Sequence, residues 1–261
     1  MGDVVVLAAG DIGECRGNDV RATAALIDTL SGEVLALGDE AYPNGNAYDY
    51  SHCYDPTWGR FRSRTHPTPG NHEYLTTGAS AYFDYFGAAA GERGKGWYSF
   101  DLGAWHIIAL NSEADTIAGG EQERWLRADL RAHPARCVLA FWHRARFSSG
   151  RHGSTAAMAP FWRDLQDAGA DLVVQAHDHD YERFDALDAD GRPNRRGPRS
   201  FVVGTGGGLR HGFGTPLPGS VIRFRDPAGV LKLTLTARSY AWEFVPVGGG
   251  RSLDRGEGNC R

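Results

Sequence analysis

Two short apolar segments near the start of the chain each end at Gly-Asp and enclose a segment with helical spacing. Val4–Ala9 and Val34–Leu37 have the unbroken hydrophobicity of buried strands, and VRATAALIDTL at 20–30 repeats apolar residues at helical intervals. A strand–helix–strand order with short links favours a parallel arrangement, in which ligand sites collect at the carboxyl ends of the strands. Gly10-Asp11 and Gly38-Asp39 stand at those two ends.

The same alternation returns in the second half of the chain. A hairpin, two helices and two buried strands are predicted at 97–101 with 105–110, 121–132, 137–142, 156–168 and 172–176. Short strands beyond Tyr181, around 201–203, 221–224, 230–236 and 242–247, are predicted to form a second sheet. Residues 43–96 have little periodicity apart from a helix near 79–86, and are expected to be ordered irregular structure over the core.

Length and composition favour one domain over 1–261. The 261 residues are 41% hydrophobic and contain no repeat, low-complexity tract or linker. Residues 248–261, rich in Gly and Arg, are expected to be a loose C-terminal tail unless Cys260 ties them down. The net charge of -4 disfavours nucleic acid as a partner, and the longest aliphatic run, Val4–Ala9, is far shorter than the ~20 residues that span a bilayer, so no membrane partner is expected.

The four cysteines and the start of the chain bear on the compartment. Cys15, Cys53, Cys137 and Cys260 form no C-x-x-C pair, which excludes a zinc ribbon and leaves either two disulfides or four buried thiols. If Met1 is the native start, the strand pattern leaves no room for a signal peptide and a cytoplasmic protein is expected. If a leader is removed, the protein is expected to be secreted, and the even cysteine count then favours disulfides.

Metal-ligand residue types follow apolar strands or glycine-marked turns at five places. They are Asp11, Asp39 with Tyr42, Asn71 with His72, His143, and His177 with His179. Each has an alternative structural interpretation, such as a helix cap, a turn residue or a buried tyrosine. Parallel strands, however, bring their carboxyl ends to one edge, where hard carboxylates would meet neutral imidazoles. The joint pattern predicts a two-metal centre.

Five ordered motifs resemble those of the calcineurin-like metallophosphoesterases. They are Gly10-Asp11-Ile12-Gly13, Gly38-Asp39, Gly70-Asn71-His72-Glu73, His143 and His177-Asp178-His179. The longer segments 38–42 and 177–183 resemble the purple acid phosphatase branch, especially its short bacterial members, and the similarity runs from about Val4 to Cys260. The resemblance implies an α/β fold, a four-layer αββα sandwich of two mixed β-sheets flanked by helices, with the metal site at the carboxyl ends of the strands.

The resemblance also implies a ligand set and a reaction. It places Asp11, Asp39, Tyr42 and His179 on one metal, and Asp39, Asn71, His143 and His177 on the other, with Asp39 bridging. A tyrosine phenolate favours Fe(III), whereas two imidazoles and an amide suit a divalent ion such as Zn, Fe or Mn. Such a pair can hold a hydroxide for in-line attack on a phosphate ester. The implied activity is phosphomonoester hydrolysis of a small molecule; a phosphodiesterase of the same superfamily and a non-catalytic metal-binding scaffold are the alternatives.

His72 and His152 are the candidate catalytic histidines. In the resembled family the position of His72 contacts the phosphate or protonates the leaving oxygen, a role that suits a histidine, and the position of His152 is a substrate-side histidine. The alternative for His152 is a solvated loop residue. His211 follows a glycine-rich loop and is a candidate for the cleft, whereas the other four histidines, His52, His66, His106 and His133, are predicted to be structural.

Two departures from the family pattern concern the ligand loops. Ala176 stands where glycine usually precedes the first histidine of the last motif, and Arg144-Ala145 stands where bacterial relatives commonly have His-Pro. Arg144 and Arg146 are candidate substrate-binding residues, and with Arg151 and Arg210 they could gather near the phosphate. Such a cluster would favour a nucleotide or another anionic phosphorylated metabolite; the alternative is that the arginines point to solvent. The natural substrate, the oligomeric state and the pH optimum are left open.

Overall fold

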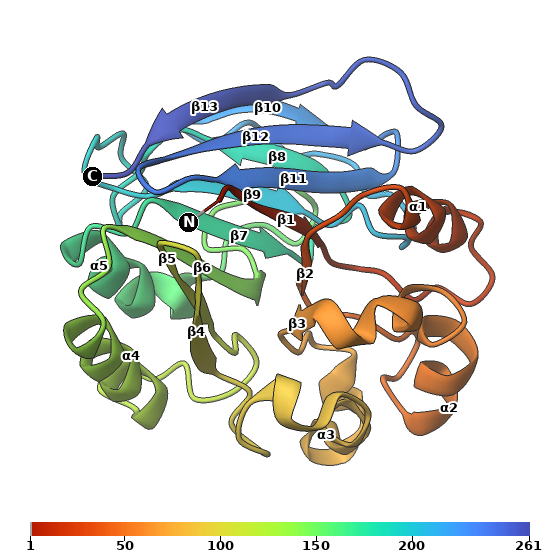
Figure 1. Ribbon diagram of the computed structural model, residues 1–261. Coiled ribbons are helices and arrows are strands. Elements are labelled where there is room, and N and C mark those ends of the chain that lie inside the picture. Colours follow the sequence, from red (N-terminus) through yellow and green to blue (C-terminus); the bar gives the residue numbers. More distant parts are fainter. Residues whose placement is uncertain (1) are drawn as a thin grey trace.

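Two mixed β-sheets lie face to face at the centre of the computed structural model, which describes residues 2–261 (Figure 1). The first sheet contains, in spatial order, β13 (Arg255–Asn259), β12 (Ser239–Pro246), β11 (Gly229–Leu235), β1 (Val4–Ala9), β2 (Glu33–Ala36) and β3 (Thr65–Pro67). The second contains β10 (Ser220–Phe224), β8 (Tyr181–Phe184), β9 (Arg199–Val203), β7 (Leu172–Ala176), β6 (Cys137–Arg144), β5 (Trp105–Ala109) and β4 (Tyr98–Leu102).

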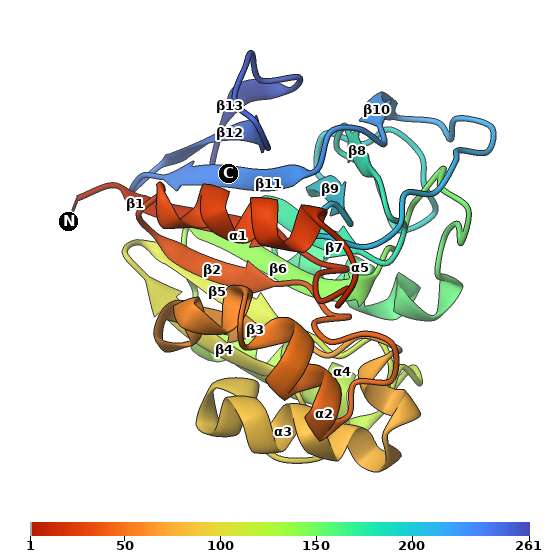
Figure 2. The same ribbon diagram turned by 90° about the vertical axis from the view of Figure 1, so that its right-hand side faces the viewer.

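Helices flank both sheets, which confirms the predicted four-layer sandwich. Helix α1 (Asp19–Asp28) lies along β1, β2 and β11 of the first sheet (Figure 2). Helices α4 (Glu121–Ala132) and α5 (Ala159–Asp167) cover the outer face of the second sheet. No helix within residues 2–261 has the length and apolar character needed to cross a membrane.

The core is split into two layers by the alternation of side chains along the second sheet. In β6, Leu139 and Phe141 point toward the first sheet, whereas Val138, Ala140 and Trp142 pack under the helices. Successive residues of a strand face opposite sides, so a strand buried on both faces must be apolar at every position. This explains why the sequence signal of β6 is an unbroken apolar run.

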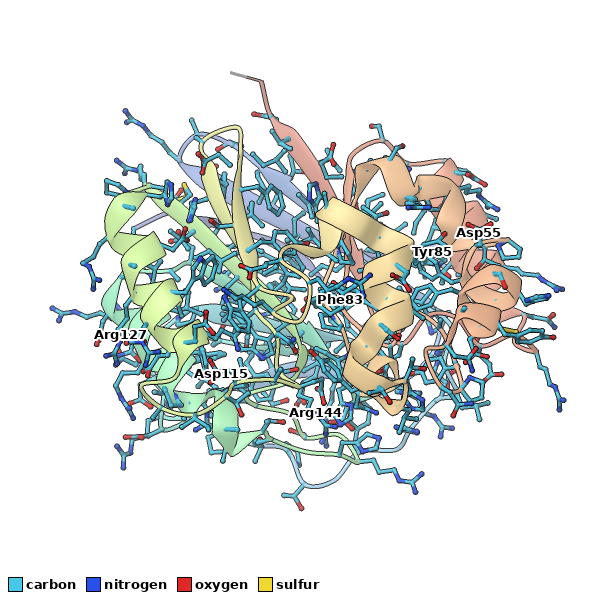
Figure 3. All side chains as sticks on the ribbon, turned by 90° about the horizontal axis from the view of Figure 1, so that it is seen from below. Asp55, Phe83, Tyr85, Asp115, Arg127 and Arg144 are labelled. Atoms are coloured by element: carbon cyan, nitrogen blue, oxygen red, sulfur yellow. A yellow bond between two sulfur atoms is a disulfide. The ribbon has the colours of Figure 1, made fainter. Side chains whose placement is uncertain are left out.

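Residues 43–96 form short helices over the end of β3. They include α2 (Ala47–Asp49), a π-helical turn at Tyr50–Tyr54 and α3 (Ser80–Phe86). The Tyr85 hydroxyl of α3 donates a hydrogen bond of 2.6 Å to Asp55, which follows the π-helical turn (Figure 3). This segment is held together by aromatic contacts, such as the stacking of Tyr50 on Tyr85 with 4.9 Å between ring centroids. Such contacts need no regular spacing of apolar residues, which explains why the sequence has little periodicity here.

The prediction that the last strands form a sheet of their own is wrong. Strands β9 and β10 join the second sheet together with β8, whereas β11 and β12 join the first. The physical reason is the open edge of β1, which pairs in parallel with β2 on one side and antiparallel with β11 on the other. The first sheet is therefore built from both ends of the chain.

Residues 248–261 are not a loose tail, because the structure shows the alternative in which Cys260 ties them down. Residues Arg255–Asn259 form β13, which pairs antiparallel with β12. Asp254, just before this strand, accepts hydrogen bonds from the buried side chains of Tyr181 and Trp242 at 2.7 and 3.1 Å. Two disulfides, Cys15–Cys53 and Cys137–Cys260, resolve the cysteine question, and the second ties the end of the chain to the start of β6.

Candidate metal centre

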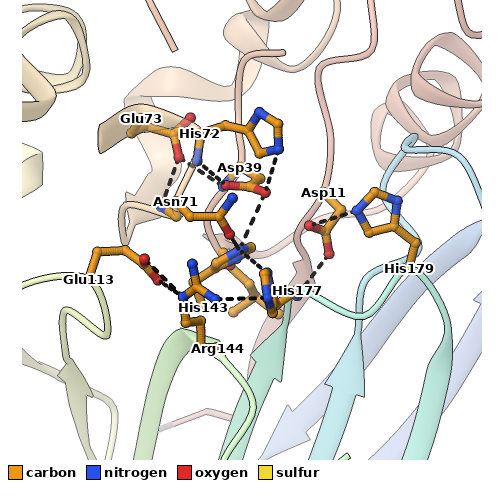
Figure 4. A network of polar contacts seen from close by, with 12 residues as sticks. Asp11, Asp39, Asn71, His72, Glu73, Glu113, His143, Arg144, His177 and His179 are labelled. Carbon is orange, nitrogen blue, oxygen red and sulfur yellow. Dashed lines mark hydrogen bonds and ion pairs between the residues drawn. The ribbon is translucent and has the colours of Figure 1, made fainter. Parts of the chain in front are cut away.

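The seven predicted ligands converge at the carboxyl ends of the strands (Figure 4). They follow or end five strands of the two sheets, in the order Asp11 after β1, Asp39 and Tyr42 after β2, Asn71 after β3, His143 near the end of β6, and His177 and His179 after β7. Parallel pairing of β1 with β2 and of β6 with β7 sets these ends side by side. Pairing within each sheet and the packing of the two sheets on each other thus bring together residues as far apart in sequence as Asp11 and His179.

Asp11, Tyr42 and His179 form one half of the centre around the Tyr42 hydroxyl. This oxygen lies 3.0 Å from Asp11 Oδ1, 3.2 Å from Asp39 Oδ2 and 3.2 Å from His179 Nε2. His179 Nε2 and Asp11 Oδ1 are 3.4 Å apart. Four donor atoms of two carboxylates, one phenol and one imidazole therefore converge on one point, as a hard metal ion requires.

Asn71, His143 and His177 form the other half. His143 Nε2 lies 3.2 Å from Asn71 Oδ1, 3.1 Å from His177 Nδ1 and 3.4 Å from Asp39 Oδ2. Asp39 Oδ2 is thus close to donors of both halves, to Tyr42 on one side and His143 on the other. This carboxylate oxygen has the position of a bridging ligand.

Backbone carbonyls fix the orientation of two ligand histidines. His143 Nδ1–H donates to the carbonyl of Leu37 at 2.8 Å, and His179 Nδ1–H donates to the carbonyl of Leu209 at 2.5 Å. Nε2 is thereby the nitrogen of each ring that faces the centre, and it would carry the ligand lone pair once the ring is deprotonated. Hydrogen bonds of this kind accompany metal-binding histidines in general, because they select both the tautomer and the ring angle.

Three of the ligands adopt left-handed backbone conformations. Asp11, Asp39 and His177 have φ angles of 56°, 50° and 73°, values that non-glycine residues seldom adopt. Strained residues of this kind persist only where the surrounding structure fixes them, and they cluster at functional sites. The left-handed backbone conformation directs each of these side chains from the end of its strand toward the centre.

Glycines leave the space that the ligands occupy. A Cβ at Gly38 would lie 2.6 Å from the His143 ring, and a Cβ at Gly70 would overlap the carboxylate of Asp39. A Cβ at Gly10 would lie 2.6 Å from that of Ala176, so the extra methyl group of Ala176 fills the space left by Gly10. The departure from glycine at 176 is therefore accommodated.

The electrostatics of the centre fit positive ions. Burial raises the pKa of Asp11 to about 7 against the lowering effect of His143. Burial also opposes ionisation of Asp39, but the neighbouring His143 outweighs it and holds the pKa of Asp39 well below its usual range. Two buried carboxylates in contact through one phenol need a nearby cation to be ionised together. The donor set of carboxylate, phenol, amide and imidazole groups fits a pair of metal ions.

The candidate catalytic histidines line the same centre. His72 Nδ1–H donates to the carbonyl of Pro43 at 2.6 Å, and its Nε2 lies 3.8 Å from Asp39 Oδ2. The His152 ring lies 4.3 Å from that of His177. His211 stacks on His179 with 4.1 Å between the ring centroids and lies 5.0 Å from His152. The structure therefore brings His72, His152 and His211 together with the ligands.

Only one of the predicted arginines belongs to this centre. Arg144 Nη1 lies 3.1 Å from His177 Nε2. Arg146 instead donates to the carbonyl of Ala189 at 2.7 Å and lies over the Phe147 ring, because β6 ends at Arg144 and the chain beyond it no longer follows the strand. Arg151 is exposed, and Arg210 forms an ion pair of 2.9 Å with Asp19. The four arginines therefore do not gather into the single cluster that was one of the two arrangements left open by the sequence.

Four acidic residues that support the ligands were not assigned a role from the sequence. Glu73 accepts the backbone N–H of Asp39 at 2.9 Å and of Gly70 at 2.8 Å, and burial followed by repulsion from Asp39 raises its pKa to about 7. Asp178 accepts the N–H of His152 at 2.7 Å and so holds the 148–153 loop over the centre. The sequence signal for Glu73 and Asp178 is their position inside the motifs named above. Glu40 follows Asp39 directly and is buried beside Glu73. Glu113, which accepts a hydrogen bond from Arg144 Nε at 2.8 Å, has no sequence signal.

Comparison with known proteins assigns the family. The sequence profile of the calcineurin-like phosphoesterases matches residues 4–181, so the chain belongs to this family. Among curated relatives, it is 28% identical over 204 residues to probable purple acid phosphatase 20 of Arabidopsis thaliana, covering 68% of this chain and 46% of that protein. It is 30% identical over 214 residues to human acid phosphatase type 7, covering 67% of this chain and 48% of that protein. The matched region thus spans less than half of either relative.

Solved structures show the same fold. The purple acid phosphatase PPD1 from yellow lupin seeds superposes with a TM-score of 0.83 at 21% identity, covering 98% of this chain and 53% of that one. GAP50, described as the anchor in the inner membrane complex of Plasmodium, superposes with a TM-score of 0.78 at 14% identity, covering 100% of this chain and 90% of that one. These comparisons confirm the predicted family, its purple acid phosphatase-like character and the fold.

Proposed function

We propose that the chain is a dinuclear-metal phosphatase that hydrolyses phosphate monoesters of small molecules. The observation that carries the proposal is the position of Asp39 Oδ2, 3.2 Å from the Tyr42 hydroxyl of one ligand group and 3.4 Å from His143 Nε2 of the other. A shared carboxylate oxygen is what two adjacent ions need. When bound, such a pair would supply the nucleophile and the positive charge that stabilises the phosphoryl group.

His72 is the residue that we propose to protonate the leaving oxygen. Its Nδ1–H is committed to the Pro43 carbonyl, so Nε2 is the atom that can carry a transferable proton toward the centre. The side chain is 29% exposed, which allows the proton to be replaced from solvent. His152, whose backbone is held by Asp178, and His211, which stacks on His179, are proposed to contact the phosphate from the opposite side.

Arg144 supports a substrate with more negative charge than a simple monoester. Its Nε is held by both oxygens of Glu113 at 2.8 and 2.9 Å, so the guanidinium has a fixed place beside the centre. When His177 Nδ1 is a ligand, the His177 proton lies on Nε2, which can no longer accept a hydrogen bond from Arg144. The Nη groups are then available to a carboxylate or a second phosphate of the substrate. The proposed substrate class is a nucleotide or another anionic phosphorylated metabolite. This proposal rests on Arg144 alone among the four arginines.

The proposal is tested by phosphate release from aryl monoesters, an aryl diester, sugar phosphates and nucleotides with protein loaded with Fe, Zn or Mn. We expect monoesters to be hydrolysed faster than bis-p-nitrophenyl phosphate. A faster diester reaction would replace the proposal by a phosphodiesterase. For the anionic substrate, Arg144→Ala is expected to lower kcat/KM for nucleotides ~10-fold more than for p-nitrophenyl phosphate, with exposed Arg163→Ala as the control. Equal losses on both substrates would refute the role of Arg144.

Iron in the first half of the centre is proposed from Tyr42. A phenolate suits a hard trivalent ion, and we expect Fe(III) there with Zn, Fe or Mn in the other half. Iron-loaded protein should then be coloured by tyrosinate-to-Fe(III) charge transfer, and Tyr42→Phe should remove the visible band. A colourless iron-loaded wild type would exclude Tyr42 as a ligand.

A non-catalytic anchoring role is the second candidate function. It is favoured by the likeness to GAP50, whose structure is described as an anchor and has this fold over 90% of its chain. The retention of all seven ligand residues supports the enzyme instead. Absence of turnover on the full substrate panel with both metals bound would favour the anchor. The two disulfides support an oxidising compartment for either function.

A further inference from the structure

A second cluster of metal-ligand side chains lies at the opposite edge of the second sheet. His106 is the second residue of β5, and Asp129 and His133 lie in and just after the last turn of α4. The candidate metal centre is at the carboxyl ends of the strands, whereas these residues are at the amino end of β5. From the sequence alone, both histidines are predicted to be structural.

Asp129 joins the two histidines. Its Oδ2 lies 2.8 Å from His106 Nε2, and its Oδ1 lies 3.1 Å from His133 Nδ1. One potential ligand atom from each of the three residues lies within 4.8 Å of both others. The two imidazole rings are nearly parallel, with 4.8 Å between centroids and an interplanar angle of 18°. Three potential ligand atoms of two types are thus gathered in one cluster, in which His133 Nδ1 also lies 3.1 Å from the backbone carbonyl oxygen of Asp129.

Further carboxylate and hydroxyl groups hold this arrangement in place. Asp101 Oδ1 lies 2.8 Å from His106 Nδ1, so Asp101 orients the ring with its Nε2 facing Asp129. The Ser99 hydroxyl donates to Asp129 Oδ1 at 2.8 Å. A carboxylate on the far nitrogen of a metal-binding histidine is a recurrent feature of zinc sites, where it orients the ring and raises its basicity.

The cluster is open to solvent at His133, whereas His106 and Asp129 are buried, and its carboxylates favour positive charge. Asp101 and His133 line a surface cavity of about 280 Å³ together with Trp105 and Pro134. His133 caps the carboxyl end of α4, where the helix dipole is negative. When a metal ion displaces the protons of both histidines, the carboxylates of Asp101 and Asp129 leave a charge that one divalent ion would balance.

We propose that His106, Asp129 and His133 form a further binding site for a divalent transition ion, separate from the dinuclear centre, with Asp101 as a positioning residue. Two imidazoles and one carboxylate select zinc over calcium or magnesium, which prefer oxygen ligands. The fourth position of a tetrahedral ion would be open to water from the cavity. An ion at this site would connect the β4–β5 hairpin to the end of α4.

The test counts zinc on the full-length protein. Chelator-treated protein is loaded with excess Zn²⁺, passed through a desalting column and analysed for bound zinc per chain. We expect His133→Ala to retain one equivalent less than wild type, and exposed His52→Ala to retain the wild-type amount. This difference is independent of how many ions the dinuclear centre holds. Equal zinc content in wild type and His133→Ala would overturn the proposal.

A second measurement uses calorimetric titration of Zn²⁺ into protein whose dinuclear centre is already loaded. Wild type and His52→Ala should show a further binding event that is lost in both His133→Ala and Asp129→Asn. The event should also weaken at pH 5.5 relative to pH 7.5, because protons compete for the imidazoles. Persistence of the event in either variant would refute the assigned ligands.

Discussion

Asp39 combines three properties that seldom occur in one residue. Its side chain is 2% exposed, its backbone has a φ of 50°, and its Oδ1 accepts the N–H of His72 at 2.8 Å while Oδ2 faces both ligand groups. The backbone N–H of Asp39 is in turn held by Glu73 at 2.9 Å. Every atom of the carboxylate is therefore committed, and no neighbouring side chain can take its place.

We expect Asp39→Asn to abolish paired metal binding. The amide removes the negative charge and one acceptor oxygen between the two ligand groups, although it is nearly isosteric. Turnover of p-nitrophenyl phosphate should fall at least ~10³-fold, together with loss of at least one metal per chain. Metal analysis and kcat measured on the same preparation check this. Near-normal kcat with both metals retained would contradict a bridging role.

His72 offers a test that separates proton transfer from binding. If Nε2 protonates the leaving oxygen, His72→Ala should slow an alkyl phosphate ~10²-fold or more and p-nitrophenyl phosphate much less, because nitrophenolate leaves without help. His52→Ala is a suitable control, since His52 is exposed and contacts only Ser51 and Tyr48. Equal losses on both substrates would instead indicate that His72 binds the phosphate.

The residues that could be predicted from the sequence are those that end a strand. Asp11, Asp39 and His177 follow apolar runs, so parallel pairing of β1 with β2 brings Asp11 beside Asp39, and the face-to-face packing of the two sheets adds His177. The arginines follow no such rule. Arg144 and Arg146 are two apart, yet one faces His177 and the other Ala189, because Glu113 and Phe147 hold them in different surroundings. Contacts between loops distant in sequence have no local signal.

The turn after β2 connects backbone geometry to metal binding. Gly38 has a φ of 85°, and any Cβ there would meet the His143 ring. We expect Gly38→Ala to lower the free energy of unfolding by at least ~2 kcal/mol and to displace His143. Gly94→Ala is the matched control, because Gly94 has a φ of 84° with open space around it and should cost only about 1 kcal/mol. Denaturant unfolding of the metal-free variants measures both; equal costs would show that the clash is relieved.

The contact between the β4–β5 hairpin and α4 should depend on pH in the metal-free protein. Burial lowers the pKa of His106, but hydrogen bonds to Asp129 and Asp101 outweigh it and raise the pKa above its ordinary 6.5. Burial likewise opposes the ionisation of Asp129, and its hydrogen bonds with His106 and Ser99 lower its pKa below 3.8. His106, whose pKa is raised, stabilises the folded state below pH ~6.5 and loses this effect as the pH rises. Asp129, whose pKa is lowered, stabilises the folded state above pH ~4 and loses this effect as the pH falls.

Asp129→Asn should therefore cost more stability at pH 5.5 than at pH 8. We expect a loss of about 1–3 kcal/mol at pH 5.5, because a charged hydrogen bond in a buried position is removed, and a smaller loss at pH 8. Asp28→Asn, which removes an exposed ion pair with Arg60, should cost less than ~1 kcal/mol. Urea unfolding at pH 5.5 and pH 8 measures the loss of stability in each variant. A larger loss for Asp129→Asn at pH 8 than at pH 5.5 would contradict a charged hydrogen bond between His106 and Asp129.

Elements with strong periodicity could be predicted closely. Strands β1 and β7 and helix α4 have the predicted bounds, since each has an uninterrupted apolar run or a clear helical stripe. Strand β13 contains two glycines among five residues and has no apolar signal. It exists because its partner β12 presents a free edge and because Cys260 is fixed to Cys137. Tertiary contacts, and not local β-propensity, therefore determine that residues 255–259 form a strand.

The two disulfides differ in how much chain they close. Cys137–Cys260 spans 123 positions and Cys15–Cys53 spans 38. In the chain-entropy account, loops of this size contribute about 4 to 5 and about 3 to 4 kcal/mol. We expect the double variant Cys137→Ala with Cys260→Ala to lower the melting temperature and to expose β13 to proteolysis. Cys15→Ala with Cys53→Ala should destabilise less and leave β13 protected; the reverse order would contradict this account.

The position of β1 between β11 and β2 has a consequence for the order in which the molecule is completed. A chain that emerges amino end first can form β4 to β7 from neighbouring segments, but β1 obtains its second partner only when residues 229–235 have arrived. Asp11 and Asp39 leave that unfinished sheet, whereas His143 and His177 leave the earlier one. Four of the seven candidate ligands, Asp11, Asp39, Tyr42 and Asn71, thus belong to the sheet that is completed last, and His143, His177 and His179 belong to the other. We expect the two groups to be joined in their final geometry only after residues 229–235 have been synthesised.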